Sequence, residues 1–119
     1  MKVEIDPCCL CPIDPGILPL VQALNNCGYK TYMSCAGHDD GRMDTLFPGE
    51  GWVQVDNGDF TALKGLMEGR FWLDAYIRWY HGPVEQSFLV ISRGYLECEG
   101  IKFDWAVNDL IEGINRIRR

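Results

Sequence analysis

The chain has 119 residues, of which 47% are hydrophobic and 24% are charged. These values fit one globular domain that is large enough to bury a core. The net charge of −6 argues against broad binding to nucleic acid backbones, which requires clustered lysine and arginine. No apolar run approaches the roughly 20 residues of a membrane helix, so we expect no membrane span.

The N-terminal residues 1–7 lack the apolar core and the cleavage site of a signal peptide, which predicts a cytoplasmic protein. Its six cysteines are then expected to be metal ligands, reactive thiols or packing residues rather than disulfides, because the cytoplasm is reducing. Three arginines close the chain, and we expect them to face the negative end of a terminal helix rather than nucleic acid.

The first quarter of the chain predicts one strand, one loop and one helix. Residues 2–5 have the pattern of a short strand, and prolines make residues 7–16 a loop. Asp14 and Pro15 have the pattern of a cap and the first residue of a helix, but Pro19 conflicts with that start. Either the helix begins nearer Pro19, or residues 15–18 form a separate tight turn. Gly28 is expected to end this helix.

The middle of the chain predicts further strands around a second helix. Residues 30–34 form a predicted strand, and a long polar loop separates it from a half-buried strand at residues 51–56. Asp59 follows a turn and is expected to cap a helix whose buried stripe extends to Phe71. Residues 73–80 alternate between apolar and polar side chains and form the clearest strand.

Residues 87–92 are apolar on both faces, which predicts a central strand. Residues 94–100 show no clear pattern, and a final helix is expected from about Asp104 to Arg118. The order predicts a single α+β domain over residues 1–119. We expect a two-layer sandwich with a mixed or antiparallel sheet of about four to five strands and three helices. Its βαββαβ part could form a ferredoxin-like core.

Two short segments have the spacing of metal ligands. Cys8 and Cys11 form a C-x-x-C pair, and Cys35 and His38 form a C-x-x-H pair. Tetrahedral zinc takes four such ligands, and both pairs lie in loops whose backbone can wrap around an ion. The sequence therefore predicts a zinc site, provided that the first loop folds across the end of the second predicted strand. Cys9 could replace either cysteine of the first pair.

Other interpretations of the same residues stay open. The C-x-x-C pair could be a redox motif, although Pro12 follows it and the helix starts later. Cys35 could instead be a catalytic nucleophile with His38 as its base and Asp39 or Asp40 as the orienting carboxylate. In a third interpretation the first cysteines are buried packing residues and the histidine is an exposed loop residue.

The remaining cysteines, histidine and tryptophans have simpler expected roles. Cys27 and Cys98 are expected to be buried packing residues. His81 lies in a Gly-Pro turn and is expected to be exposed, with a smaller chance of joining the site. The tryptophans are expected in the core or at its edge: Trp52, Trp72, Trp79 and Trp105.

The run GYKTYMSCAGH at residues 28–38 resembles two known patterns. One is G-x-x-T-x-x-S-C-x-G-H, found in small uncharacterised bacterial and phage proteins. The other is the S-x-S-C-S-G-R hallmark of the wybutosine-synthesising tRNA methyltransferase family, from which Ala36 and His38 depart. The corresponding residues are Ser34, Cys35 and Gly37. This second resemblance implies an active-site loop that uses S-adenosylmethionine, with Ser34 and Gly37 binding the cofactor.

Three hypotheses about function follow. The first is a zinc-binding domain with an accessory or regulatory role. The second is an enzyme that uses S-adenosylmethionine or a nucleotide, as the methyltransferase resemblance implies. The third is a non-catalytic interaction module that forms a homodimer through the strand at residues 73–80. A small-molecule ligand is compatible with the loop, whereas nucleic acid is not an expected partner.

Overall fold

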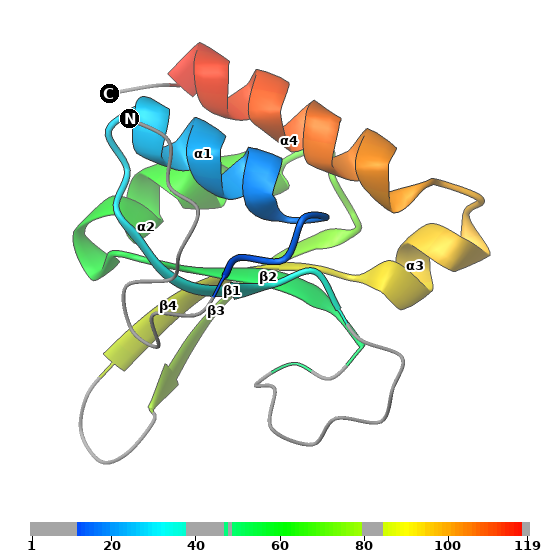
Figure 1. Ribbon diagram of the computed structural model, residues 1–119, viewed down its shortest axis with the longest axis horizontal. Helices are drawn as coiled ribbons and strands as arrows, with labels where there is room; N and C mark the ends of the chain where they lie inside the picture. Colours follow the sequence, from blue (N-terminus) through cyan, green and yellow to red (C-terminus); the bar gives the residue numbers. More distant parts are fainter. Residues whose placement is uncertain (1–11, 38–46, 48, 80–84, 118–119) are drawn as a thin grey trace.

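One antiparallel sheet of four strands organises the chain (Figure 1). The computed structural model describes residues 12–37, 47, 49–79 and 85–117; the side chains of Arg78 and Trp79 are excepted. The elements follow in the order α1 (Leu18–Asn26), β1 (Thr31–Cys35), β2 (Gly51–Val55), α2 (Asn57–Lys64), the 3-10 helix η1 (Gly65–Met67), β3 (Leu73–Trp79), β4 (Glu85–Ile91), α3 (Arg93–Cys98) and α4 (Phe103–Ile117). The predicted α+β class is confirmed, and the predicted strand at residues 2–5 lies outside the described residues.

The strand order is β1-β2-β4-β3, and each neighbouring pair is antiparallel. Because β4 runs opposite to both β2 and β3, these two strands point the same way, and α2 connects them. This is a split β-α-β unit, in which β4 fills the gap between the two parallel strands. The prediction of a central strand at residues 87–92 is confirmed, since β4 lies inside the sheet and its last five residues are buried.

Helix α1 begins at Leu18, next to Pro19, and a separate turn precedes it, so both features that the prolines predicted are present. Residues 15–17 form a separate turn, in which the N–H of Leu18 donates to the carbonyl of Asp14 at 3.0 Å. Pro19 then occupies the first turn of the helix, where its missing N–H costs nothing. Gly28 ends the helix as predicted, with a φ of 89° that a glycine adopts without strain.

Helix α2 begins earlier than predicted because a different aspartate caps it. Asp56 has an extended backbone, and its carboxylate accepts a hydrogen bond from the N–H of Gly58 at 3.1 Å. The prediction that Asp59 is the cap is wrong: Asp59 lies in the first turn, and its carboxylate accepts from the N–H of Lys30 at 3.2 Å. The prediction that Phe71 is buried is also wrong, because this side chain is 80% exposed beyond the end of η1.

Two further expectations are wrong, one for Cys98 and one for β2. Residues 94–100 contain most of α3, whose cap Ser92 accepts a hydrogen bond from the N–H of Tyr95. Cys98 ends that helix on its exposed side and is therefore not a packing residue. Strand β2 is buried along its whole length, not half-buried, because side chains cover both faces of the sheet.

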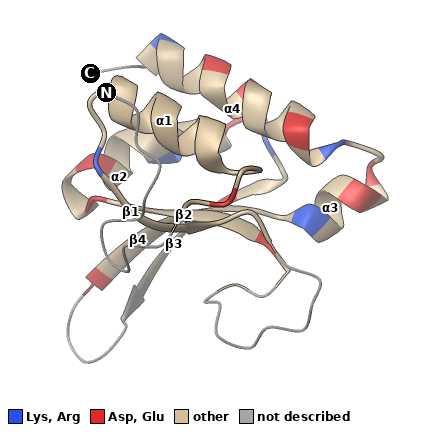
Figure 2. Cartoon of the chain, in the orientation of Figure 1, with Lys and Arg blue, Asp and Glu red and all other residues tan. Residues whose placement is uncertain are grey.

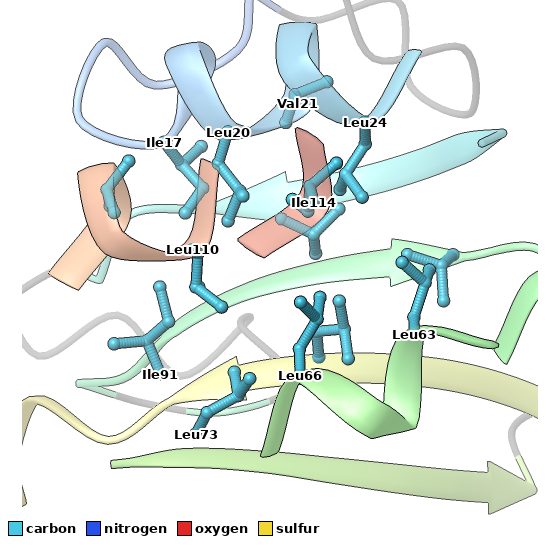
Figure 3. Packing of buried hydrophobic residues seen from close by; sticks show 14 of the residues in the cluster. Ile17, Leu20, Val21, Leu24, Leu63, Leu66, Leu73, Ile91, Leu110 and Ile114 are labelled. Atoms are coloured by element: carbon cyan, nitrogen blue, oxygen red, sulfur yellow. The ribbon is translucent and has the colours of Figure 1, made fainter. Parts of the chain in front are cut away.

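Helices α1, α2 and α4 cover one face of the sheet (Figure 1). Their aliphatic side chains interlock with those of β2, β3 and β4 in the main core (Figure 3). The fully buried residues of this helix-side core include Ile17, Leu20, Leu24, Leu63, Leu73, Ile91, Leu110 and Ile114. The amphipathic pattern predicted for the final helix is confirmed, because Val107, Leu110 and Ile114 lie on its buried side.

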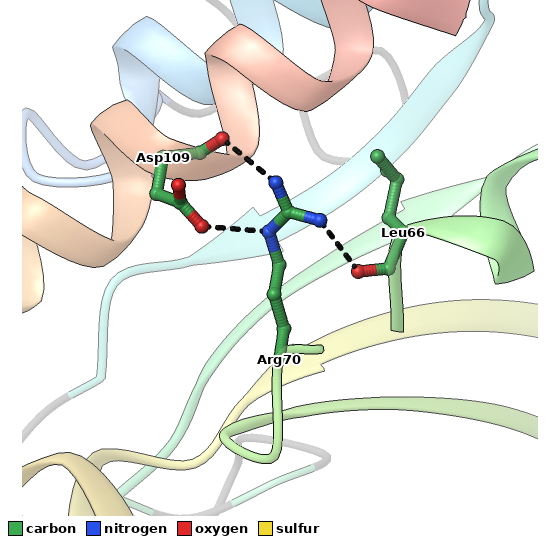
Figure 4. Close-up of polar contacts among 3 residues, drawn as sticks. All are labelled: Leu66, Arg70 and Asp109. Carbon is green, nitrogen blue, oxygen red and sulfur yellow. Dashed lines mark hydrogen bonds and ion pairs between the residues drawn. The ribbon is translucent and has the colours of Figure 1, made fainter. Parts of the chain in front are cut away.

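Arg70 ties the segment after η1 to α4 (Figure 4). Its Nε donates to the Oδ2 atom of Asp109 at 2.7 Å, and one terminal nitrogen donates to the carbonyl of Asp109 at 3.3 Å. The other terminal nitrogen donates to the carbonyl of Leu66 at 3.0 Å. Helix α4 approaches closely here because Gly113 has no side chain; a Cβ atom would lie 2.9 Å from Leu66 and Arg70.

Charges of both signs are spread over the described elements, with acidic residues between the basic ones (Figure 2). Among the helices that the structure describes, none is both long and apolar enough to cross a membrane.

Candidate functional site

The sheet face opposite the helices carries a second, aromatic cluster. It consists of Cys35, Phe47, Trp52, Phe88 and Val90, with Met33 packed against it. Phe47 lies against Trp52 and Phe88, with ring centroids 6.0 and 5.2 Å apart. Cys35, the last residue of β1, stands opposite Trp52 in the sheet. The aromatic cluster therefore buries the thiol of Cys35, the first residue of the C-x-x-H pair.

The residue after Cys35 is held by two charged side chains. The N–H of Ala36 donates to the Oδ2 atom of Asp14 at 3.1 Å, and its carbonyl accepts from the Nε atom of Arg93 at 2.7 Å. Hydrogen bonds to charged groups are among the stronger ones in proteins. Asp14 and Arg93 thus form a clamp that fixes the chain direction at the end of β1.

Arg93 is itself held from two further sides. Its guanidinium lies over the ring of Phe103, 3.9 Å from the centroid, in a cation–π arrangement. Its backbone N–H donates to the carboxylate of Glu50 at 3.1 Å. The clamp is therefore anchored to α3 and α4, which lie far from β1 in the sequence.

Two glycines, Gly37 and Gly51, allow the side chains of Arg93 and Phe103 to approach the backbone closely. Gly37 has a φ of 98°, and a Cβ atom there would lie 2.7 Å from the Nε atom of Arg93. A Cβ atom on Gly51 would lie 2.6 Å from the ring of Phe103. Distances below 3.0 Å are too short for real contacts, so each glycine permits one half of the Arg93–Phe103 stack.

The sulfur of Cys35 receives a backbone hydrogen bond. The N–H of Gly37 points toward this Sγ atom at 3.4 Å, and the side chain is only 6% exposed. A backbone N–H directed at sulfur favours the negatively charged thiolate, whereas burial among apolar side chains favours the neutral thiol. A thiolate is the form in which cysteine binds a metal or attacks an electrophile.

Most of the predicted ligand set falls outside the described residues. This applies to Cys8, Cys9, Cys11, His38, Asp39, Asp40 and His81. Of the four predicted zinc ligands, the structure places only Cys35. Within the described ranges, no group of three or more His, Cys, Asp or Glu side chains could hold a metal ion. The zinc set and the pairing of Cys35 with His38 and Asp39 remain predictions.

The two residues predicted to bind a cofactor lie on either side of the clamp. Ser34 is on β1 opposite Val53, and it makes contacts of its own. Gly37 already directs its N–H at the Cys35 sulfur, and Arg93 fills the space above its Cα atom. A role for Ser34 and Gly37 in binding S-adenosylmethionine stays a prediction.

The other cysteine and tryptophan predictions can be compared with the structure directly. Cys27 is buried as expected, and its thiol donates to the side-chain oxygen of Asn115 at 3.3 Å. Trp52 and Trp72 are buried as expected, whereas Trp105 is 56% exposed on α4. The side chain of Trp79 is not among those described.

Two polar side chains on the aromatic face have unmet hydrogen-bonding capacity. The Oε1 atoms of Gln54 and Gln86 are buried, and no partner for either is found among the described residues. Gln54 stands opposite Phe88, and Gln86 precedes Phe88 by two positions, so both share the face of the aromatic cluster. A buried acceptor without a partner costs about 1–3 kcal/mol, and the helix-side core contains no such described group.

The sequence did not reveal the clamp. Asp14 has the position of a helix cap, and Arg93 lies where the pattern is ambiguous. The one available signal was the pair of small residues after Cys35, which permits a close approach by some other part of the chain.

Comparisons with protein-family models, with curated proteins and with solved structures found no match for this chain. The resemblance of residues 28–38 to the two motif patterns therefore remains a prediction. Functional inference must come from the geometry around Cys35.

Proposed function

We propose that the protein binds one zinc ion at the end of β1, with Cys35 as the anchoring ligand. Cys8, Cys11 and His38 are the other ligands in this proposal, as their spacing predicts. The observation that supports it most is the hydrogen bond from the N–H of Gly37 to the sulfur of Cys35. This bond would favour the thiolate that zinc requires, against the cost of burying a charge in the aromatic cluster.

The clamp gives the proposed ligand a fixed position. Asp14 and Arg93 hold both polar backbone groups of Ala36, the residue between the thiol and its N–H donor. A thiolate held in this way loses little conformational freedom when it binds an ion, which favours affinity. Loss of a group that orients a metal ligand typically lowers metal affinity about 10- to 100-fold.

Four protein ligands leave no open position on a tetrahedral zinc ion. The ion would therefore tie the N-terminal loop to the end of β1 rather than activate a water molecule. This role is structural, and it suits an accessory or regulatory domain.

Elemental analysis of the full chain, purified without added metal, tests the proposal. We expect about one zinc ion per chain. We expect Cys35→Ala to remove the ion, and Cys98→Ala to retain it because Cys98 is exposed on α3. A folded protein that carries no metal and takes up none on addition of zinc would refute the proposal.

A second set of variants tests the ligand set one residue at a time. We expect Cys8→Ala, Cys11→Ala and His38→Ala each to weaken zinc binding strongly, as measured by competition with a chromophoric chelator. We expect Cys9→Ala to have little effect. If Cys9→Ala loses zinc and Cys8→Ala retains it, Cys9 is the ligand in place of Cys8.

A further inference from the structure

The two edges of the sheet differ in how far they are protected. The edge strand β1 has five residues, and its pairing with β2 shifts register between Thr31 and Ser34. Short length and irregular register both discourage pairing with another chain. The opposite edge strand, β3, has seven residues in unbroken register with β4 from Leu73 to Trp79.

The outer hydrogen-bonding groups of β3 can be assigned from one contact. The N–H of Ser92 donates to the carbonyl of Trp72 at 2.7 Å. The backbone N–H and C=O groups of Trp72, which precedes β3, therefore point toward the β4 side of the sheet. Hydrogen-bonded pairs alternate along antiparallel strands. The N–H and C=O groups of Ala75 and Ile77 therefore point away from β4, and no partner for them is found among the described residues.

Exposed apolar side chains accompany this free backbone edge. Ile77 is 52% exposed on the helix side of the sheet, and Tyr76 is 42% exposed on the other side. Tyr76 stacks on Phe47 with ring centroids 5.7 Å apart, so its ring is held in place. Long edge strands with exposed apolar side chains are templates for pairing with a further strand.

We propose that β3 pairs antiparallel with β3 of a second copy of this chain, centred on Tyr76. The two four-stranded sheets then continue into one another across the interface. In this arrangement Ala75 of each copy exchanges two backbone hydrogen bonds with Ile77 of the other, which uses the groups that point outward.

The charge pattern of β3 selects both the partner and the register. A two-fold axis that pairs identical edge strands lies perpendicular to the sheet, so each side chain keeps its own face. With the axis at Tyr76, Asp74 of each copy stands opposite Arg78 of the other. This register places opposite formal charges at two pairs of facing positions. With the axis at Asp74, two carboxylates would face each other, which is unfavourable.

Sedimentation analysis of the full chain over a range of concentrations tests the proposal through charge exchange. We expect the unmodified protein to form dimers. We expect Asp74→Arg and Arg78→Asp each to raise the dimer dissociation constant by about tenfold or more, because each places like charges opposite one another. The control Asp104→Arg makes the same change in net charge as Asp74→Arg, at an exposed site on α4, and should leave dimerisation unchanged.

Mixing the two single variants provides the sharpest test. Asp74→Arg carries two basic residues on β3 and Arg78→Asp carries two acidic ones, so we expect the mixture to form heterodimers. We also expect the double exchange, Asp74→Arg with Arg78→Asp, to restore the homodimer. A monomeric unmodified protein would overturn the proposal, and so would a dimer that neither single variant weakens. If the mixture of the two single variants forms no heterodimer, the register centred on Tyr76 is wrong.

Discussion

The two faces of the sheet differ in chemistry and in completeness. The helix-side core is built mainly of aliphatic side chains, and Arg70 makes three hydrogen bonds there, two of them to Asp109 on α4. The opposite face carries the aromatic cluster with a thiol, and the buried oxygens of Gln54 and Gln86 have no described partner there. The comparison indicates that the helix side supplies most of the stability.

The largest expected effect lies in the helix-side core. Leu110 is fully buried on α4, so Leu110→Ala should lower the free energy of unfolding by about 2–5 kcal/mol. Urea denaturation followed by tryptophan fluorescence measures this change. Asn108→Ala, at an exposed position of the same helix, is the control and should have little effect. A cost below about 1 kcal/mol for Leu110→Ala would contradict the dominance of this face.

The next effect lies at the clamp. Gly37→Ala should cost about 1–3 kcal/mol, because its φ is positive and the new Cβ atom would collide with Arg93. Gly49→Ala is a matched control, since Gly49 has a φ of 78° but no neighbour within 4 Å. The difference between the two variants isolates the contact with Arg93. An equal loss of stability in both variants would show that the side chain of Arg93 moves aside without a measurable cost.

A smaller effect of opposite sign is expected at Gln54. Gln54→Met removes a buried oxygen that lacks a described partner and keeps the side-chain volume, so it should stabilise the fold by about 1 kcal/mol. Thermal unfolding measures the change, and Gln22→Met on the helix side is the control. Destabilisation by Gln54→Met would mean that the side-chain amide of Gln54 has a hydrogen-bond partner. The two faces of the sheet would then not differ in unpaired buried polar groups.

The smallest effect concerns Tyr32 on β1. Its hydroxyl donates to Asp56 at 2.9 Å, and this hydrogen bond, with lesser contributions from burial and the negative charge of Asp56, raises the pKa of Tyr32. A raised pKa in the folded state adds stability below the ordinary tyrosine pKa. That contribution disappears as the pH rises through the raised pKa.

Phenolate absorbance should therefore show Tyr32 titrating above the ordinary tyrosine range, and Asp56→Asn should lower its midpoint. Asparagine also caps helices, so this variant changes the charge while retaining a cap for α2. Tyr32→Phe identifies the tyrosine signal. An unchanged midpoint in Asp56→Asn would show that another group holds the phenol proton.

The sequence pattern was sufficient wherever local periodicity and a long run coincided. The amphipathic stripe of α4, the alternation of β3 and the two-sided apolar run of β4 each predicted an element that the structure contains. Local pattern was insufficient for the six-residue α3 and for the choice between Asp56 and Asp59 as a cap. A single turn of helix contains too few residues for its period to be read.

By itself, the sequence determined the α+β class, the central place of β4 and the thiol at the end of β1, because burial imposes its period on the residues of each element. Only the tertiary structure decided that Asp14 and Arg93 meet at Ala36 and that β3 is an edge of the sheet that the described strands form. Asp14 and Arg93 are 79 positions apart, and their contact depends on the order of strands and the packing of α3 and α4. No local pattern encodes such a distance, since it results from how all the elements share one core.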